Sequence, residues 1–388
     1  MQLYGQTMMA SQRPSLLLTE PQKRILWQLR IAGPLPRVQL AAALGMNGAS
    51  MTRLTQHLSA MGLVEELSAD EVAARGRPTV PLAVSGHGGW SVGATLHLGW
   101  LELVVIDFRG LPLLHDRVPF ADPDPRVFAR TLDTRLRALA ADHGFMRGRF
   151  LGLGVAVPGY VLGNDRNRRK VVDWLAPWND VPLDEVLGDV LSMPVWIEND
   201  GTAAALAEYY QPQIVAYHRS VLVLFLGHGV GAGLVAERSL FPGEHGNAGE
   251  VGRLFPGNGP RPSGIDLLKT LQQAGVEITS LSEIATVMTA QHALIETWVN
   301  RVAIQLELAV FSGVVWLDPG AVVISGALPP AILQSLAARI EALSAARGQT
   351  YLAAQPRIYA SSMGSAAVVI GAALAPVHAI TALRGENG

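Results

Sequence analysis

The amino-acid sequence predicts an α/β protein in which a small domain of helices and a hairpin precedes a larger body of alternating strands and helices. Residues 1–84 contain three short segments with helical spacing, followed by two strand-like runs around a turn. Beyond residue 90, strand-like and helix-like segments alternate at a spacing typical of an α/β fold. The glycine-rich run Ser85–Gly89 lies between the two patterns and predicts a flexible joint and a domain boundary.

Composition and charge narrow the function classes. The chain has 388 residues, 49% hydrophobic and 16% charged, a balance typical of a compact protein of roughly two or three domains. The absence of cysteine excludes disulfides, thiol nucleophiles and thiolate metal sites. The net charge of −2 excludes a polycation that coats nucleic acid. Residues 1–84 nevertheless carry eight Arg or Lys against five acids, so a nucleic-acid site is expected there.

Three short helices are predicted in residues 1–84. The first begins at Thr19, which forms a capping box with Gln22, and its apolar residues keep helical spacing as far as Gly33-Pro34. The second covers Val38–Leu44, and the third runs from about Ser50 to Met61. A glycine follows both of these helices, because a residue without a Cβ suits the left-handed turn at a helix end.

Two strand-like runs, Leu63–Glu66 and Thr79–Val84, surround a loop with the basic tip Arg75-Gly76-Arg77-Pro78. Helices followed by such a hairpin are the layout of a winged helix-turn-helix, in which one helix fits the major groove of DNA and the wing reaches a minor groove or phosphates. The candidate DNA-binding residues are Ser50, Thr52, Arg53, Gln56 and His57 on the third helix, with Arg77 and Arg75 at the wing. The alternative is an ordinary helical cap whose polar face is merely solvated.

The body is predicted to alternate strands and helices, with no convincing tandem repeat. Its elements, in order, are strand 101–107, helix 125–143, strand 150–157, helix 183–190, strand 195–198, helix 202–210, strand 220–226, a long helix within 287–311, strand 321–325 and a final helix from about residue 365. The first 14 residues lack the apolar stretch of a secretion signal, and 366–377 is too short to span a bilayer. A cytoplasmic protein is therefore expected.

Glycine clusters and polar residues in the body predict a binding site. The glycines lie at 152–159, 227–233 and 243–249, where a backbone that approaches a ligand closely would need them. Glu198-Asn199-Asp200 follows a strand, and Glu250 follows the last glycine cluster. Carboxylates and an amide at strand ends suit a polyhydroxylated ligand, because each pairs with hydroxyl groups in a crevice. Taken singly, each cluster is also compatible with a tight turn and a helix cap.

At these residues the chain resembles the ROK family, a group of repressors and sugar kinases. The matching motifs are 153–159, Glu198-Asn199-Asp200 with Ala203–Ala205 and Glu208, 227–233, 246–252, Leu317-Asp318-Pro319, 323–326 and, in the DNA-binding head of the repressor branch, Gly76-Arg77-Pro78. The resemblance implies a winged helix-turn-helix at 1–84 and a two-lobed, actin-like (ribonuclease H-like) body. Its lobes would be 85–200 and 201–388, with the C-terminal helix packing back on the first.

The resemblance also implies a sugar site at Asn199, Asp200 and Glu250. In the kinases of the family, the aspartate that matches Asp200 is the general base for the sugar hydroxyl that attacks the nucleotide's phosphate. In a repressor the same carboxylate would bind sugar only.

The phosphate loop of the family's kinases, Asp-x-Gly-Gly-Thr, is replaced here by Thr95-Leu96-His97-Leu98-Gly99. His97 and Leu98 bring side chains to positions where backbone amides would have to touch phosphate. The sequence therefore predicts no ATP-dependent phosphorylation, no catalytic residue and no cofactor.

The family's structural zinc site is also altered. Arg253 stands where the family has a histidine, and the following Leu254–Ser263 contains no cysteine, so the sequence predicts no metal. Prolines in this loop are expected to stiffen it instead. Asp266 replaces a glutamate that follows the cysteine cluster, which adds Arg253 and Asp266 to the predicted effector site. Arg253 would favour an anionic sugar, or would turn outward and pair with a surface carboxylate.

The prediction is a DNA-binding transcriptional regulator, a repressor, controlled by a carbohydrate-like effector bound between the lobes. Its expected partners are a double-stranded DNA operator, the effector and a second copy of the chain, with no membrane. Closure of the cleft by the ligand would alter the spacing of the two heads and lower operator affinity. Two alternatives stay open: a ROK-type sugar kinase with an appended DNA-binding head, and a regulator that binds DNA but no ligand.

Overall fold

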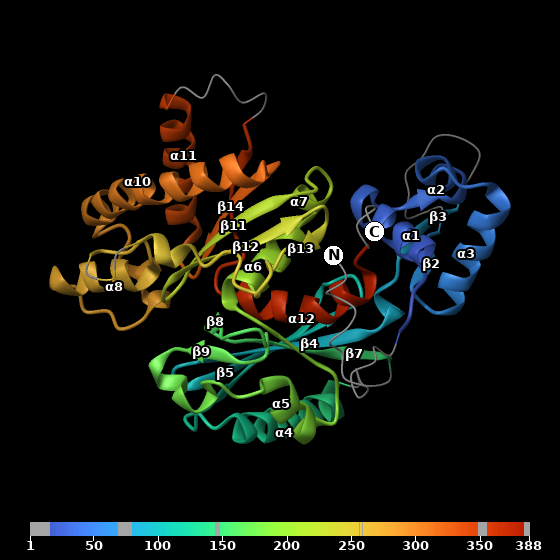
Figure 1. The fold of residues 1–388 in the computed structure, drawn as a ribbon, viewed down its shortest axis with the longest axis horizontal. Coiled ribbons are helices and arrows are strands. Elements are labelled where there is room, and N and C mark those ends of the chain that lie inside the picture. Colours follow the sequence, from blue (N-terminus) through green and yellow to red (C-terminus); the bar gives the residue numbers. More distant parts are fainter. Residues whose placement is uncertain are drawn as a thin grey trace.

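The computed structural model describes residues 16–68, 80–143, 148–255, 257, 259–347 and 355–383. Figure 1 shows a small helical head at one side of a body with two lobes, each built on its own sheet. The predicted α/β fold class, a small head before a two-lobed body, is confirmed, while the tip of the predicted wing lies outside the described residues. The boundaries after residues 84 and 200 fall between β3 and β4 and at the start of α6, and we keep them as proposed boundaries.

The head contains three helices and a three-stranded sheet of order β1-β3-β2. Its elements are α1 (Glu20–Ala32), β1 (Leu35–Pro36), α2 (Arg37–Leu44), α3 (Gly48–Ala60), β2 (Val64–Glu66) and β3 (Pro81–Val84). The start of α1 is fixed as predicted, because the Thr19 N–H donates to Gln22 Oε1 at 2.9 Å. Gly45, at φ +63°, ends α2 in the left-handed conformation. The Asn47 side chain accepts a hydrogen bond from the Ser50 N–H and caps α3.

The first lobe is a five-stranded sheet of order β10-β7-β4-β5-β6. Its elements are β4 (Trp90–His97), β5 (Trp100–Asp107), β6 (Pro112–Pro119), α4 (Pro125–His143), β7 (Phe150–Ala156), α5 (Leu183–Leu191) and β10 (Val195–Glu198), with a separate hairpin of β8 (Gly159–Val161) and β9 (Arg169–Val171). Alternation along β5 places Leu103 and Val105 in a core with α4 and α5, whereas Val104 and Ile106 join a core that contains α12.

The second lobe has a sheet of order β13-β12-β11-β14-β15. Its elements are α6 (Asp200–Tyr209), α7 (Pro212–Val215), β11 (Val221–Leu226), β12 (Val230–Ala236), β13 (Ser239–Leu240), α8 (Gly264–Gln273), α9 (Ile284–Val287), α10 (His292–Leu317), β14 (Ala321–Gly326), α11 (Pro330–Ala346), β15 (Arg357–Ala360) and α12 (Ala366–Thr381). Leu222 and Leu224 of β11 pack with α8, α10 and α11, while Val221 and Val223 pack with α6 and α12.

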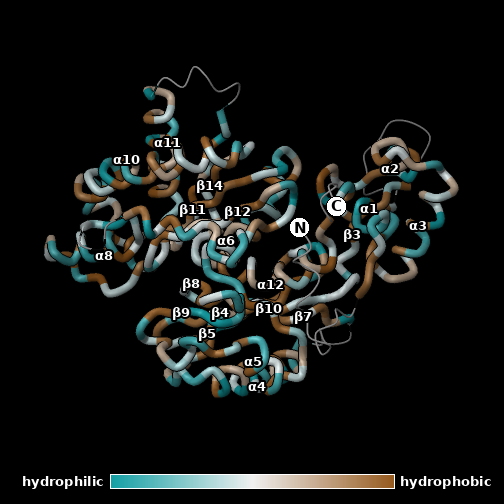
Figure 2. Tube along the Cα trace, viewed as in Figure 1, coloured by the Kyte–Doolittle hydropathy of each residue, from teal (hydrophilic) through white to brown (hydrophobic). Residues whose placement is uncertain are grey.

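Helices α6 and α12 fill the centre of the molecule between the two sheets (Figure 1). Figure 2 shows hydrophobic segments concentrated along the central strands and these inner helices. The backbone of α12 approaches the first sheet and α6 closely, because glycine occupies the positions where these backbones meet. A Cβ at Gly93 of β4 or Gly154 of β7 would overlap the backbone of α12, and a Cβ at Gly371 of α12 would overlap the Ala203 carbonyl of α6.

The joint between head and body is packed, so the prediction of a flexible segment is wrong. Gly86–Gly88 forms a single turn of 3-10 helix, and the Ser85 hydroxyl donates to Glu65 of the head at 2.9 Å. A side chain at Gly86 would overlap the Asp107 carboxylate, and one at Gly88 would meet Phe108. These glycines permit close packing of the head on the body rather than motion.

Helix α10 is the one described helix that is long and apolar enough to cross a membrane by length and composition. Half of its most apolar window is buried inside the protein. Trp298, Val302 and Leu306 lie in the core of the second lobe, and a core helix satisfies the same test of length and composition.

Candidate functional site

The N-terminus of α6 joins the two lobes. Asn199 caps the helix, because its Oδ1 accepts a hydrogen bond from the Thr202 N–H at 2.6 Å. Its Nδ2 donates to Glu250 Oε1 at 3.1 Å. The end of β10 in the first lobe is thereby tied to the 243–250 loop of the second. Asn199, Asp200 and Glu250 therefore lie at one place between the sheets, as the glycine and carboxylate motifs suggested.

Asp200 has an unsatisfied polar atom at this place. Its Oδ1 is buried and has no hydrogen-bond partner. Burial raises the pKa of the Asp200 carboxyl to about 6, although the charges of His97 and Arg169 oppose the shift. A buried oxygen without a partner is uncommon in native proteins. A ligand hydroxyl would supply the missing hydrogen bond.

Arg169 of β9 is the main site residue that the sequence reasoning missed. It is 3% exposed, its Nη2 donates to the Ile197 carbonyl at 3.1 Å, and its Nε has no partner. Burial lowers the pKa of Arg169, and the charges of Glu198, Glu250 and Asp200 act in the opposite direction. The signal in the sequence was the basic run 166–170, which an exposed loop would also explain.

Two further carboxyls complete the charged cluster. Burial raises the pKa of both Glu198 and Glu250, and Arg169 counteracts the shift at both. The buried Arg169 therefore interacts with the charges of three carboxyl groups, those of Glu198, Asp200 and Glu250. Arg169 Nε is a donor without a partner, and Asp200 Oδ1 is an acceptor without one. This arrangement suits a neutral ligand with several hydroxyl groups, which both donate and accept hydrogen bonds.

Arg253 lies at the edge of the cluster. It is exposed, its guanidinium carbon lies 4.6 Å from the ring centroid of Tyr160 in the first lobe, and its charge lowers the pKa of Glu250. Within the described ranges no carboxylate lies within salt-bridge distance of Arg253. The predicted pairing of Arg253 with a surface carboxylate is thus not seen among these residues, and its orientation toward an effector stays a prediction.

The β8–β9 hairpin of the first lobe holds the 243–250 loop of the second. The Val161 N–H donates to Asn247 Oδ1 at 2.7 Å, and Asn247 Nδ2 donates back to the Val161 carbonyl at 3.1 Å. Arg166 Nη2 donates to the Gly243 carbonyl at 2.9 Å. These bonds link the two lobes directly beside Glu250.

The segment that matches the kinase phosphate loop forms a tight hairpin between β4 and β5. Leu98 and Gly99 make the turn, and the Leu98 side chain is 71% exposed. The His97 ring stacks on Trp100 with centroids 3.7 Å apart, and its Nε2 lies 2.9 Å from Glu102 Oε2. Side chains therefore occupy this hairpin, which lacks the run of glycine amides that cradles a phosphate.

Asp266 is not brought into the cluster. It lies in α8, where its carboxylate accepts a hydrogen bond from Trp298 Nε1 at 2.7 Å and pairs with Arg301. Both partners lie on α10, one turn apart, and none of the described contacts of Asp266 reaches Asn199, Asp200 or Glu250. The carboxylate borders an open hollow of about 380 Å³ on the outer side of the second lobe. Asp266 therefore lies apart from Asn199 and Glu250, contrary to the prediction that grouped these residues in one site.

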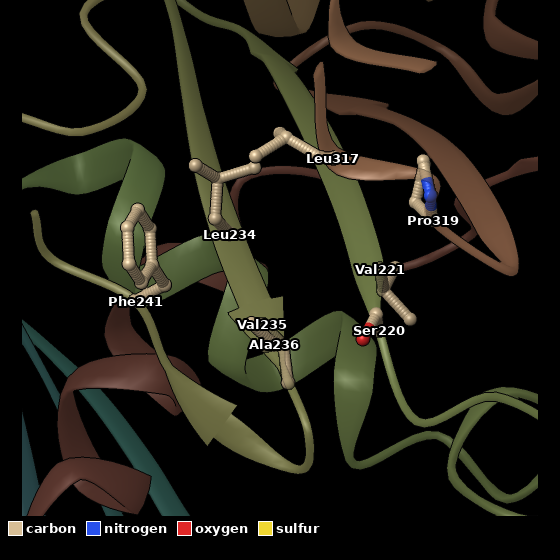
Figure 3. A pocket seen from close by; sticks show the side chains of 8 residues that line it. All are labelled: Ser220, Val221, Leu234, Val235, Ala236, Phe241, Leu317 and Pro319. Atoms are coloured by element: carbon tan, nitrogen blue, oxygen red, sulfur yellow. The ribbon is translucent and has the colours of Figure 1, made fainter. Parts of the chain in front are cut away.

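A second cavity also lies away from the cluster. Its volume is about 80 Å³, and Figure 3 shows its lining side chains on β11, β12 and the end of α10. Its lining is almost entirely apolar, with side chains from Ser220, Val221, Leu234, Val235, Ala236, Phe241, Leu317 and Pro319. A pocket without paired donors and acceptors does not suit a sugar.

The residues after Glu250 do not fit the zinc site of the family. No cysteine is present in the chain, and no group of three metal-ligating side chains occurs among the described residues. Protein hydrogen bonds hold the loop instead: Arg261 donates to the Gly252 carbonyl, and Gln305 Nε2 donates to the Pro260 carbonyl at 2.8 Å. Pro256, one of the three prolines expected to stiffen the loop, lies outside the described residues.

The polar face of α3 is open to solvent. Thr52, Arg53, Gln56 and His57 are exposed, while Ser50 is half-buried. His57 Nδ1 lies 2.8 Å from Gln22 Nε2, so its ring is held against α1. The predicted wing residues Arg75 and Arg77 lie outside the described residues.

A family model described as the ROK family matches residues 102–377. The chain belongs to the ROK family. Among curated relatives, an uncharacterised protein of Sinorhizobium fredii is 32% identical over 293 residues, which cover 76% of this chain and 74% of the relative. The xylose repressor of Bacillus spizizenii is 24% identical and covers 62% of each chain. A glucokinase of Halalkalibacterium halodurans is 30% identical over 168 residues, 42% of this chain and 48% of the relative.

Solved structures confirm the ROK fold. A ROK family transcriptional regulator, a homologue of the Escherichia coli MLC protein, matches with a TM-score of 0.69 at 21% identity, over 93% of this chain and 96% of its own. The ROK hexokinase of Thermus thermophilus has a TM-score of 0.57 at 24% identity, over 74% of this chain and 97% of its own. This ROK chain spans about three fifths of the xylose repressor that it matches.

Proposed function

We propose that this ROK protein is a DNA-binding transcriptional repressor that responds to a carbohydrate-like effector bound between its lobes. The observation that carries the proposal is the head. The structural match to a ROK regulator covers 93% of the chain, whereas the match to a ROK hexokinase covers 74%. The head places the exposed polar face of α3 on a domain with a net basic charge, beside an acidic body.

The proposed effector site consists of Asn199, Asp200 and Glu250, with Arg169 beneath them and Arg253 at the edge. The free Oδ1 of Asp200 and the free Nε of Arg169 offer an acceptor and a donor in one buried place. A sugar with adjacent hydroxyl groups satisfies both. Relatives named for xylose make an aldose the first class to test.

The proposed mechanism is linkage between effector and operator. A sugar that bridges the Asn199 end of α6 and Glu250 favours one arrangement of the lobes, and a head packed on both lobes then changes its orientation. The proposed partners are a double-stranded operator and a second copy of the chain, with half-sites about one helical turn apart. The proposed location is the cytoplasm.

Substitution of the exposed α3 residues tests DNA binding. Arg53→Ala and Gln56→Ala are each expected to weaken operator binding about tenfold, since a base contact contributes on the order of 1–3 kcal/mol. Genomic fragments selected by the purified chain supply the operator, and fluorescence anisotropy at fixed salt gives the Kd. Arg126→Ala, an exposed arginine on α4, is the matched control and should leave the Kd unchanged. Equal affinity of all four proteins for the selected fragment and for random DNA would refute sequence-specific binding by α3.

A sugar kinase is the second candidate function, because Asp200 is present and a glucokinase is among the relatives. Its carboxyl, with a pKa raised to about 6, would take the proton of a sugar hydroxyl. The side chains of the His97–Leu98 hairpin argue against phosphate binding. No ATP turnover above background is expected in a coupled assay with D-xylose, D-glucose and N-acetyl-D-mannosamine. Sugar-dependent turnover that Asp200→Asn abolishes would establish the kinase and overturn this expectation.

A further inference from the structure

We propose that α6 is the coupling element between the effector site and the head: its first turn forms the site, and its last residues form the seat on which α1 rests. This inference rests on the proposed function and names how that site is regulated. Buried residues of α1 belong to the same hydrophobic core as those of α6 and α12.

The seat is aromatic, with Tyr209 buried and Tyr210 half-buried. The ring of Trp27 in α1 lies 6.2 Å from Tyr209 and 5.8 Å from Tyr210, the residues at the end of α6. Trp27 is 1% exposed, and its Nε1 donates to the Thr381 carbonyl at the end of α12 at 2.8 Å. Directional aromatic contacts and a buried hydrogen bond specify one orientation of α1.

Arg30 adds a half-buried charge beside the seat. Its guanidinium carbon lies 5.3 Å from the ring centroids of both Phe108 and Tyr210. It donates to the Phe108 carbonyl at 2.8 Å and to the Arg109 carbonyl at 3.1 Å. These contacts hold the last turn of α1 against both the end of β5 and the end of α6, and a head that tilted away would lose two hydrogen bonds and both ring contacts.

Helix α6 is built to move as one piece. Its ten residues span about 15 Å, from Asp200 at the site to Tyr209 at the seat. Every residue from Gly201 to Tyr209 is buried. The glycine and alanines of this helix let it pack closely against neighbouring backbones. A Cβ at Gly201 would meet Ala232 of β12, just as one at Gly371 of α12 would meet Ala203. Close-packed interiors transmit displacement instead of absorbing it.

The head also contacts the first lobe. Arg149 Nη1, beside the start of β7, donates to the Met61 carbonyl after α3 at 3.3 Å and to the Gly88 carbonyl at 3.1 Å. Helix α1 is therefore held both by α6 and α12 and by the end of β5, while the end of α3 is held by Arg149 of the first lobe. A change in the angle between the lobes must rotate or strain the head.

Hydrogen–deuterium exchange of the full chain tests the coupling without sugar or DNA. Asp200→Asn removes the buried charge at the start of α6 and its attraction to Arg169. Exchange of α1 amides, residues 20–32, is expected to change at least threefold in this variant. The matched control is Asp266→Asn, which alters a carboxylate bound to α10 and should leave α1 unchanged. Amides of α11 report any global change in stability. Changed exchange at 199–206 with α1 unchanged would overturn the proposal.

Operator affinity gives a second readout that separates the two proposals. Asp200→Asn is expected to shift the Kd for the selected fragment at least threefold, and the shift should vanish in an Arg30→Met background. A shift that persists with Arg30→Met would exclude the seat as the route. If the wild-type chain binds no DNA, the proposed function fails, while the exchange of α1 still decides the coupling.

Discussion

The Gly371→Ala variant is expected to lose about 3 kcal/mol of unfolding free energy or more, at the upper end of the cost of overpacking a core. Alanine is the better helix former, so an isolated α12 would gain about 1 kcal/mol from the same change. In the folded protein the change is destabilising instead, because the new Cβ would overlap the Ala203 carbonyl. That carbonyl belongs to the backbone of α6 and cannot rotate away. The two central helices would have to separate along their length.

The matched control is Gly188→Ala in α5. A Cβ there meets only the Met193 carbonyl at 3.9 Å, an ordinary contact, so a gain of up to about 1 kcal/mol is expected. Urea unfolding followed by circular dichroism measures both variants against the wild type. If Gly371→Ala unfolds at the wild-type midpoint, α6 and α12 are not in backbone contact.

Acid is expected to destabilise the fold through His378 of α12, whose ring centroid lies 6.2 Å from that of Trp27 and 6.0 Å from that of Tyr210. Burial lowers the pKa of His378 to about 4, from 6.5 for a free imidazole. The unfolded chain therefore binds the proton first, and stability that is present above pH 6.5 falls as the pH drops toward 4. The full loss is about 3 kcal/mol, since one pKa unit corresponds to about 1.4 kcal/mol. Asp200, with a raised pKa of about 6, acts in the opposite direction, so the His378 contribution must be measured as a difference.

His378→Gln isolates this contribution. A neutral amide can still accept from the Leu240 N–H and reach Tyr210, the contacts of the two ring nitrogens. Between pH 7.5 and pH 5, the wild type should lose about 2 kcal/mol relative to His378→Gln. His143→Gln, at an exposed position on α4, should show no such difference. Parallel pH profiles for the wild type and His378→Gln would show that His378 is charged in the folded chain.

Elements with clear periodicity were predictable from the sequence. The structure places α4 at Pro125–His143 and β10 at Val195–Glu198, the predicted bounds. β12 was missed because Gly231 and Gly233 suggested a loop. The structure needs glycine in that strand, since a Cβ at Gly233 would meet the Gly201 carbonyl at the start of α6. Glycine demanded by a tertiary contact looks the same in sequence as glycine demanded by a turn.

Site residues were predictable only where a polar residue directly follows a strand or a glycine cluster in the sequence. Asn199 and Asp200 follow a strand, and Glu250 follows a glycine cluster, so their types and positions indicated a site. Arg169 comes from a hairpin whose position depends on contacts with Asn247, far along the chain. The contact between α1 and the end of α6 was not predictable, because nothing in the sequence around Trp27 and Tyr210 distinguishes them from other aromatic residues of a core.

The two ends of the described chain meet, and this has a consequence for biosynthesis. Trp27 binds a carbonyl 354 positions later, and Lys23 binds the Ala382 carbonyl. A ribosome therefore makes the head before it makes the end of α12 on which the head rests, 354 positions further along the chain. A nascent or prematurely terminated chain can present the three helices of the head without the helix that orients them. The head thus acquires its fixed position on the body only after α12 has been synthesised.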